Sequence, residues 1–594
     1  MKKLFLKAYA LLPPKQRKGL FVLLPFILIG MLLETVSVGL VIPAMGMVVG
    51  GINQAVPTRI TTFLNSLNLD IFSMGLIPIA MIGLGLVFFV KNIFLGYLAW
   101  KQANFSQSVK SQLSRLLFSA YLNKAYTFHL ERNSAQLIRN VTTEITLFTL
   151  CLNSFLSLIT EGLIAFGVVC LLMFVEPTGA LMIISLLGFA TWTFYRTTKK
   201  KLTDWGTLRQ KYDGSMLQSL QQGLGAVKDI SILGRQDQIT EDFSAQMLAA
   251  SAVEVKQVTL QQIPRLWLEF LAVCGLILLV ISMEHQGYSG SEMVPKLGLF
   301  AAAAFRLLPS FNRLLSSAHF LRYALPAIKV LSEEMEGSGQ QRLERPSVGD
   351  VVGESPSFSN TISLANVTYT YPGATTPSLK NVSLEIKKGE FIGFIGGSGA
   401  GKSTLVDAIL GLLCPDSGKV TVDSVEIQNN LRWWQNQIGY VPQSIFLTDA
   451  SLRSNIALGI AENLIDDEAI GLALKAAQLD QFVASLPDGI NTFVGERGVR
   501  LSGGQLQRIG IARALYHNPS VLVLDEASSA LDTATEESLM MAISALHGKK
   551  TIILIAHRLS TVMGCDSLYQ IEAGRLERGG SPSEVLKLYK SKSE

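Results

Sequence analysis

The sequence predicts two domains of different class: an α-helical membrane domain followed by an α/β domain in water. Long apolar runs are confined to residues 1–333, and from Thr361 onward short aliphatic strands alternate with helices. Charged residues make up 16% of the 594 residues, below the ~25% usual in soluble domains, as expected when an apolar half dilutes a polar one. The stretch 334–360, rich in Gly, Ser and Pro, is predicted to be a linker, which leaves 361–594 for the second domain.

Six apolar stretches are predicted to cross the membrane as helices. A spanning helix needs ~20 apolar-rich residues, and a water-soluble core does not need six such runs. The fourth and the sixth stretch reach that length only with their flanking residues. The predicted spans are residues 21–50, 71–100, 148–175, 181–195, 266–283 and 294–308.

The distribution of Lys and Arg predicts the orientation of these spans. Both residue types gather in the N-terminal segment and in the connections after the second and fourth spans, whereas the other connections nearly lack them. Because basic connections stay in the cytoplasm, we expect both termini and the second domain there. The two basic connections are long, so helices should continue beyond the bilayer through 102–124 and 197–222, with polar turns at 127–133 and 223–235.

The first outer connection, residues 51–70, predicts a short amphipathic helix. Its apolar residues recur at helical spacing, and a helix placed on the outer face could handle a lipid tail. A packed loop that caps the first two spans explains the same pattern. The residues are Ile60, Phe63, Leu64 and Leu67.

A phosphate-binding loop is predicted near the start of the second domain. Phe391–Ile395 has the composition of a buried strand and 404–413 the apolar period of a helix, and the pattern GxxxxGK[ST] lies between them. Its glycines let backbone N–H groups surround phosphate at a helix N-terminus. Lys402 would hold the β- and γ-phosphates, and Ser403 would bind Mg²⁺. The residues expected to contact nucleotide are Gly396, Gly397, Ser398, Gly399, Ala400, Gly401, Lys402, Ser403 and Thr404.

Two adjacent acids follow the aliphatic strand predicted at 521–524. Asp525, at the end of that strand, suits contact with Mg²⁺, and Glu526 suits polarisation of the water that attacks the γ-phosphate. Such a pair is common by itself, but here it follows a phosphate-binding loop. The sequence therefore predicts an ATP- and Mg²⁺-dependent ATPase.

Between these motifs lies Leu501-Ser502-Gly503-Gly504-Gln505, the signature of ATP-binding cassette (ABC) transporters, and residues 361–581 resemble that family's cassette. The resemblance implies that the signature, from Ser502 to Gln505, faces the ATP held by a second cassette. It also implies an α/β ATPase core with antiparallel β and helical subdomains.

The resemblance assigns roles to residues that are uninformative alone. Tyr371 resembles the aromatic that stacks on adenine, and His557 the switch histidine that bonds the γ-phosphate. Gln443 resembles the loop glutamine that senses the γ-phosphate and contacts the membrane domain, and it is also expected to contact the metal. Residues 495–498 resemble an exporter-specific segment, and 529–532 the loop that pairs across the dimer.

One cassette behind one set of six spans resembles half of an exporter, so we expect two copies of the chain to form a homodimer. A heterodimer is the alternative, but such pairs often carry a degenerate site, whereas Lys402, Gln505, Glu526 and His557 are all of the active type. The turns at 127–133 and 223–235 resemble coupling helices that dock into cassettes. No nucleic acid partner is expected.

Ionisable residues inside the spans are candidates for substrate contact. Four cations fall ~20–30 Å below the outer span ends: Lys91, Arg265, Arg306 and Arg313. Since arginine forks pair well with phosphate oxygens, they predict a site for an anionic headgroup. Structural pairing is the alternative: Arg265 and Glu269 are i,i+4, Lys91 and Arg313 could reach the interface, and Glu34 could partner one of the cations.

Short motifs in the spans resemble bacterial flippases of lipid-linked oligosaccharides, at 33–35, 225–230, 264–269 and 305–313. This resemblance implies the bacterial inner membrane and a polyprenyl-pyrophosphate oligosaccharide that alternating access moves to the outer leaflet. The alternative is an exporter of drugs, peptides or another lipid such as lipid A. An ATP-gated channel is a third class, and nothing resembling a regulatory insertion supports it.

Overall fold

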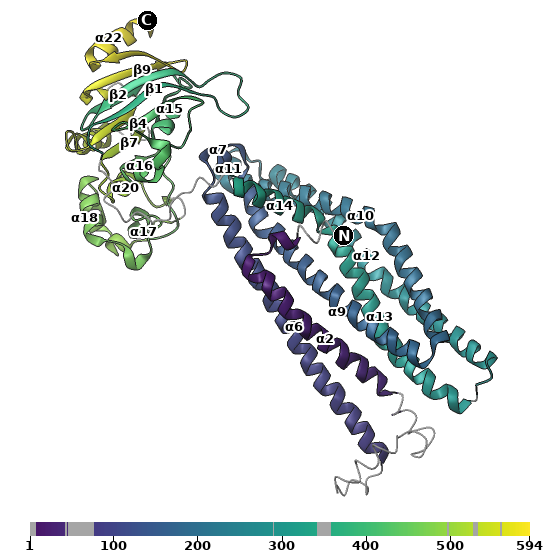
Figure 1. Ribbon diagram of the computed structural model, residues 1–594. Coiled ribbons are helices and arrows are strands. Elements are labelled where there is room, and N and C mark those ends of the chain that lie inside the picture. Colours follow the sequence, from purple (N-terminus) through teal and green to yellow (C-terminus); the bar gives the residue numbers. More distant parts are fainter. Residues whose placement is uncertain are drawn as a thin grey trace. The chain divides into compact units, whose positions relative to one another are not determined.

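The computed structural model describes residues 8–41, 44, 76–288, 290–340, 358–495, 498–526, 533–556, 558 and 561–593. It divides into a membrane unit, Met1–Lys124 with Arg132–Gln341, and a cassette unit, Ala125–Glu131 with Arg342–Glu594. The first consists of helices and the second of sheets with helices (Figure 1). The predicted outer helix at 51–70 and most of the predicted linker lie outside the described residues.

Six long helices form the described part of the membrane unit: α2 (Pro14–Gly39), α6 (Leu76–Leu122), α9 (Ile145–Val175), α10 (Pro177–Gly225), α12 (Gln236–His285) and α13 (Gly290–Tyr323). Each overlaps one predicted span, and α6 and α10 continue far past their apolar parts, as expected. Within the described residues, five helical stretches are long and apolar enough to cross a membrane. They do not include α13, which carries Lys296, Arg306 and Arg313.

Short helices occupy both predicted polar turns. Asn133 caps one by accepting the N–H of Ala135 at 2.9 Å, and Gly234 ends another with φ +62°. The last helix covers the start of the predicted linker, so helical structure extends past the expected boundary at residue 333. The short elements are α7 (Tyr126–Glu131), α8 (Ser134–Arg139), the π-helical turn η2 (Asn140–Glu144), α11 (Val227–Leu233) and α14 (Leu325–Gln340).

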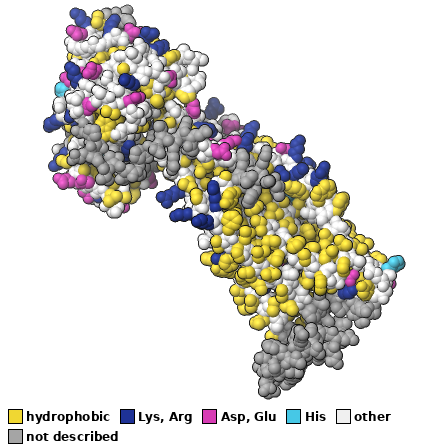
Figure 2. Space-filling view, in the orientation of Figure 1, with side chains coloured by type: hydrophobic (Ala, Val, Ile, Leu, Met, Phe, Trp, Pro, Cys, Tyr) yellow, Lys and Arg dark blue, Asp and Glu magenta, His cyan; other side chains and the backbone are white. Residues whose placement is uncertain are grey.

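Large apolar side chains cover the visible face of the membrane unit (Figure 2). Phe174 is 89% exposed and Phe89 63%, which would be unfavourable in water and is expected against lipid. Val168, Leu279 and Phe300 belong to a buried cluster that ties the helices together. The unit thus exposes apolar surface while each helix satisfies its own backbone, as a bilayer requires.

The cassette contains two sheets. One is antiparallel, with the order β2-β1-β4-β5; the other has the order β10-β9-β3-β8-β7-β6 and is parallel except for β10. The strands are β1 (Thr361–Tyr369), β2 (Leu379–Lys387), β3 (Phe391–Ile395), β4 (Ser417–Val422), β5 (Val425–Glu426), β6 (Ile438–Val441), β7 (Val521–Asp525), β8 (Thr551–Ile555), β9 (Ser567–Glu572) and β10 (Arg575–Gly580).

Helices surround these sheets. They are α15 (Lys402–Ile409), α16 (Leu431–Asn436), α17 (Leu452–Ile456), α18 (Asp467–Ala476), α19 (Asp480–Ser485), α20 (Gly503–Leu515), α21 (Thr533–Ser544) and α22 (Pro582–Ser593), with 3₁₀ turns at η3 (Ile427–Asn430), η4 (Glu462–Leu464), η5 (Gly489–Asn491) and η7 (Thr561–Gly564). Every residue of β3 and β8 is buried, which explains their unbroken aliphatic sequences. Because β3, β6, β7 and β8 are parallel, the loops after them meet at one edge of the sheet.

Candidate functional site

The phosphate-binding loop joins β3 to α15, and two of its glycines leave no room for a side chain. Gly396 has φ +154°, and a Cβ there would lie 2.2 Å from the carbonyl oxygen of Ile571. Gly401 has φ +106°, and its Cβ would lie 2.8 Å from the carbonyl oxygen of Ser378. The loop can therefore pass close to neighbouring backbone and present its own N–H groups at the start of α15, where an anion is favoured.

Lys402 is held over this loop. Its side chain is buried, and Nζ donates to the carbonyl oxygens of Gly396 and Gly397 at 2.9 and 3.0 Å. Burial lowers the pKa of Lys402. Phosphate oxygens would accept these hydrogen bonds more strongly than neutral carbonyls do. A cleft of about 470 Å³ lies beside the loop and is lined by residues 396–400, 570–573 and Tyr589.

The residues predicted for catalysis meet after β6 and β7. Gln443 Nε2 donates to the Glu526 carboxylate at 2.5 Å, and the Tyr440 hydroxyl donates to Asp525 at 3.5 Å. Glu526 has φ +51°, a left-handed conformation that is strained for a residue with a side chain and typical of functional sites. Its backbone N–H donates to the carbonyl of Ile555 at 3.1 Å, which ties this turn to the end of β8.

The residues predicted to contact metal fit a magnesium ion in their chemistry. Ser403, Gln443 and Asp525 offer a hydroxyl, an amide oxygen and a carboxylate, and Mg²⁺ prefers such oxygen donors together with phosphate oxygens. Within the described residues, no group of three or more His, Cys, Asp and Glu could hold a metal by itself.

The Tyr371 side chain contacts the first turn of α15. Its hydroxyl lies 3.2 Å from the Thr404 hydroxyl, and its ring meets Tyr369 edge-on with centroids 5.1 Å apart. These contacts fix an aromatic ring next to the phosphate-binding loop. Stacking of that ring on adenine stays a prediction.

The signature residues form the N-terminus of α20. The Ser502 hydroxyl accepts the N–H of Gln505 at 3.3 Å, and the Gln505 side chain accepts the N–H of Ser502 at 2.9 Å. This reciprocal pair is a capping box. Ser502 is exposed and Gln505 half-buried at the positive end of the helix dipole, so this helix end suits contact with an anionic group.

Several predicted parts of the site lie outside the described residues: His557, residues 496–497 and residues 527–532. They include the predicted switch histidine, half of the exporter-specific segment and the predicted dimer loop at 529–532. β8 ends at Ile555, two residues before His557 in the chain. Their roles stay predictions.

The sequence did not reveal a buried connection between the segment after Gln443 and α20. Asn455 is fully buried, and its side chain accepts the Thr448 N–H at 2.9 Å and donates to the Thr448 carbonyl at 3.0 Å. Arg513 of α20 donates to the carbonyls of Asn455 and Phe446 at 2.8 and 3.0 Å. No sequence pattern identifies Asn455, because a lone polar residue is usually exposed.

In the membrane unit, three of the four predicted substrate cations gather around two carboxylates. Lys91 pairs with Glu34 at 3.3 Å, and Arg306 contacts Glu34 and lies 3.4 Å from Glu161. Arg313 pairs with Glu161 at 2.6 Å. Glu161 was absent from the predicted set, although a carboxylate inside an apolar run was a signal that could have found it. We call these five residues the charge cluster.

Arg265 forms no ion pair with the charge cluster among the pairs of the described residues. It bonds Glu269 one turn further along α12 at 2.8 Å, and its side chain is 71% exposed. Exposed i,i+4 pairs are a common surface arrangement of small energetic consequence. The structure thus brings together Lys91, Arg306 and Arg313 and leaves Arg265 in the local pair that its sequence spacing allowed.

The chain matches two known families and several known proteins. Residues 379–529 match the ABC transporter family, and residues 31–283 match the ABC transporter transmembrane region. The ATP-dependent lipid A-core flippase of Methylobacillus flagellatus is 30% identical over 440 residues, which cover 73% of this chain and 72% of that protein. The flippase of the same name from Thiobacillus denitrificans is 29% identical over 517 residues, 86% of each chain.

A solved structure of a bacterial Atm1-family ABC exporter with ATP bound has the same fold. Its TM-score is 0.78 over 96% of both chains, at 22% sequence identity. The match spans membrane unit and cassette alike, which agrees with the two sheets and the long helices described above. The chain therefore belongs to the ABC transporter family and is an ATPase that drives movement of a substance across a membrane.

Proposed function

We propose that the chain flips an amphipathic lipid with a phosphate-bearing headgroup from the inner to the outer leaflet. The observation that supports this is the excess positive charge of the charge cluster, where three cations face two carboxylates. Ionisable groups within spans are costly, and they therefore usually mark functional sites. Arg313 is 61% exposed, so its guanidinium is available to bond phosphate oxygens as a fork.

Two lipid classes fit this headgroup chemistry. A polyprenyl-pyrophosphate oligosaccharide is the first, supported by the short motifs in the spans. A lipid A-core glycolipid is the second, and the names of relatives that cover most of this chain favour it. Both substrates combine acyl or prenyl chains with phosphate, so the cluster would serve either. Export of drugs or peptides would not need the excess positive charge.

In the cassette, we propose that Lys402 and the backbone of the loop bind the β- and γ-phosphates, and that Tyr371 positions the base. Glu526 would accept a proton from the attacking water, with Gln443 and His557 as its neighbours at the γ-phosphate. Mg²⁺ held by Ser403, Gln443 and Asp525 would neutralise charge on the phosphates when bound. The resemblance to ABC cassettes supports a second cassette as the source of the Ser502 end.

We infer a homodimer in the bacterial inner membrane with both termini and the cassettes in the cytoplasm. The basic connections at both predicted polar turns support this orientation. Two copies would provide two equivalent ATP sites and one pathway. Closure of the cassettes would then open the pathway to the outer side, and hydrolysis would reverse it.

The test uses the purified full chain in lipid vesicles, with ATP-driven movement of each glycolipid measured separately. Arg306→Ala should reduce transport about tenfold or more, while ATP hydrolysis without substrate persists. Arg265→Ala is the matched control, because this arginine is outside the charge cluster, and transport should be retained. Equal transport by both variants and the parent would contradict the headgroup proposal. The glycolipid that the parent protein moves identifies the lipid class.

A further inference from the structure

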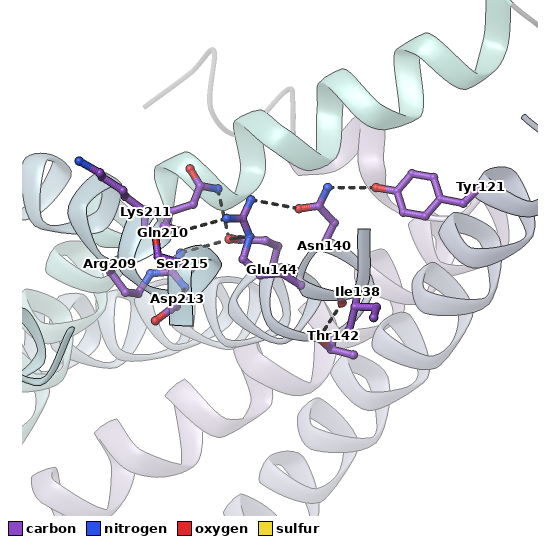
Figure 3. Close-up of polar contacts among 11 residues, drawn as sticks. Tyr121, Ile138, Asn140, Thr142, Glu144, Arg209, Gln210, Lys211, Asp213 and Ser215 are labelled. Atoms are coloured by element: carbon purple, nitrogen blue, oxygen red, sulfur yellow. Dashed lines mark hydrogen bonds and ion pairs between the residues drawn. The ribbon is translucent and has the colours of Figure 1, made fainter. Parts of the chain in front are cut away.

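A buried polar network joins α6, α8, η2 and α10, and neither the nucleotide site nor the charge cluster uses it. Glu144 and Asn140 are fully buried, and Arg209 is 7% exposed. Charges are expensive to bury unless they are paired, so the partners of these residues and a role for the network have to be identified. We call its members the polar joint, and all of them except Arg139 are labelled in Figure 3: Tyr121, Arg139, Asn140, Glu144, Arg209, Gln210 and Asp213.

Glu144 is the centre of the polar joint. Its carboxylate accepts hydrogen bonds from Arg209 and from Gln210, both at 3.2 Å, and lies 3.5 Å from Arg139 Nε. Arg209 also pairs with Asp213 at 3.2 Å. Two guanidinium groups and two carboxylates thus balance in charge, and they connect η2 to α10.

Arg139 also contacts the backbone of α10. Its Nη1 donates to the carbonyl oxygen of Gln210 at 3.0 Å. A Cβ on Gly214 would lie 2.4 Å from that same nitrogen, so the guanidinium occupies space that this glycine leaves. The contact therefore specifies one register between α8 and α10, and a shift by one residue would break it.

The π-helical turn η2 lies within the polar joint, and both of its end residues belong to it. Asn140, at the start, donates to the Tyr121 hydroxyl of α6 at 3.0 Å, and Glu144, at the end, bonds α10. Such turns are rare and occur often at functional positions. The two sets of contacts hold this irregular turn against two different helices.

A further contact extends the polar joint to α14, the helix that precedes the cassette in the chain. The Tyr121 hydroxyl, which accepts the bond from Asn140, also interacts with Glu334 of α14. Arg132, just after α7, lies 3.7 Å from Glu334. Polar contacts thus link four chain segments: α6, the segment after α7, α10 and α14.

We propose that Arg139, Glu144 and Arg209 are positioning residues for ATP-driven transport, which keep these helix bases moving as one rigid body during the ATP cycle. Apolar packing alone would let helices slide, whereas a paired, register-specific polar contact has one favourable arrangement. The inference uses the established ATPase and transport activity of the family. It does not depend on the identity of the substrate.

The first test measures rigidity across the joint. In a cysteine-free background, spin labels at Ile138→Cys and Lys211→Cys report the distance between α8 and α10, since both positions lie beside the joint (Figure 3). We expect the same distance without nucleotide and after trapping with ATP and vanadate. A distance that changes between these states means that the joint opens in the cycle and overturns the inference.

The second test measures transmission with an environment-sensitive dye at Phe174→Cys, an exposed position near the end of α9. ATP and vanadate should change its fluorescence in the parent. Glu144→Gln keeps the shape of the side chain and removes its charge. In this variant the ratio of the fluorescence change to the ATPase rate should be roughly 2- to 30-fold lower than in the parent. Asp204→Asn, an exposed carboxylate on α10, the helix that Glu144 bonds, is the matched control and should behave as the parent.

The outcomes separate positioning from simple structural support. If ATP hydrolysis and the dye response of Glu144→Gln fall in parallel, the residue only supports the fold and the inference fails. A parent that shows no dye response, or a variant that matches it, also contradicts the proposal. Should Glu144→Gln not fold, Tyr121→Phe removes only the hydroxyl contacts of the joint, and its dye response should be reduced with the ATPase rate retained.

Discussion

Gln443 and Glu526 are joined by a hydrogen bond of 2.5 Å, although 83 residues separate them in the chain. The bond forms because β6 and β7 are parallel neighbours whose carboxyl ends lie at the same edge of the sheet. It places an amide that can contact both metal and phosphate next to the proposed general base. Loss of the negative charge of Glu526 should therefore act on hydrolysis more than on nucleotide binding.

Glu526→Gln is expected to lower ATP hydrolysis by roughly 10²–10⁴-fold, because an amide cannot accept the proton of the attacking water. ATP affinity should be retained, since the loop and Lys402 are unchanged. Phosphate release and equilibrium binding of a fluorescent ATP analogue measure the two effects. Glu577→Gln, an exposed carboxylate on β10, is the control; hydrolysis that survives in Glu526→Gln would contradict the assignment.

Two adjacent glycines of the phosphate-binding loop should differ in their tolerance of alanine. Gly396→Ala places a Cβ 2.2 Å from the carbonyl oxygen of Ile571, whereas a Cβ at Gly397 meets nothing within 4 Å. The first variant is expected to lose several kcal/mol of stability or to distort the loop, and with it ATP binding. Gly397→Ala should keep the fold. Thermal unfolding and ATP binding of both variants, measured side by side, give the comparison, and equal behaviour would rule out the steric explanation.

The phosphate-binding loop and the two acids at the end of β7 could be predicted from the sequence because each is a short linear pattern in or next to a buried strand. Their chemistry depends on neighbours a few residues away, and parallel strands then bring the loops together. Tyr371, Gln443 and Ser502 needed the family resemblance, since a single polar residue carries no pattern of its own.

The pairing inside the membrane unit could not be predicted in the same way. Whether Arg265 or Arg306 faces a carboxylate of another helix depends on the rotation of each helix, and apolar runs do not specify rotation. Glu161 and Arg313 are 152 residues apart and meet only through packing of α9 on α13. The polar joint is equally hidden, because the space that Gly214 leaves for Arg139 exists only once α8 and α10 are in register.

Substitutions of Ser502 should separate its capping role from a role at phosphate. Ser502→Ala removes the acceptor for the Gln505 N–H and should cost about 1 kcal/mol of stability. Ser502→Asp keeps a good N-cap but places a negative charge where the resemblance puts the partner's γ-phosphate. We expect Ser502→Asp to retain the melting temperature and to lose ATP hydrolysis. An active Ser502→Asp variant would show that this helix end does not face phosphate.

Asp407 of α15 makes the stability of the cassette depend on pH. Burial, followed by the nearby Asp525 carboxylate, raises the pKa of Asp407 to about 6 from its ordinary 3.8. Because the folded state holds this proton more tightly, the free energy of unfolding falls as pH rises from about 4 to about 6. Above that range the folded cassette bears the full cost of the buried charge, at most about 3 kcal/mol.

Asp407→Asn removes this ionisation and should therefore raise the melting temperature of the cassette near pH 7.5, while below about pH 4 it should change little. Calorimetry of the full chain over that pH range measures the effect, and Asp449→Asn, an exposed carboxylate of the same unit, serves as control. The sign of the change in unfolding free energy with pH is informative. A carboxylate stabilised by a nearby cation would make that free energy rise with pH instead of fall. An unchanged pH slope in Asp407→Asn would mean that other groups, not this carboxyl, govern acid-range stability.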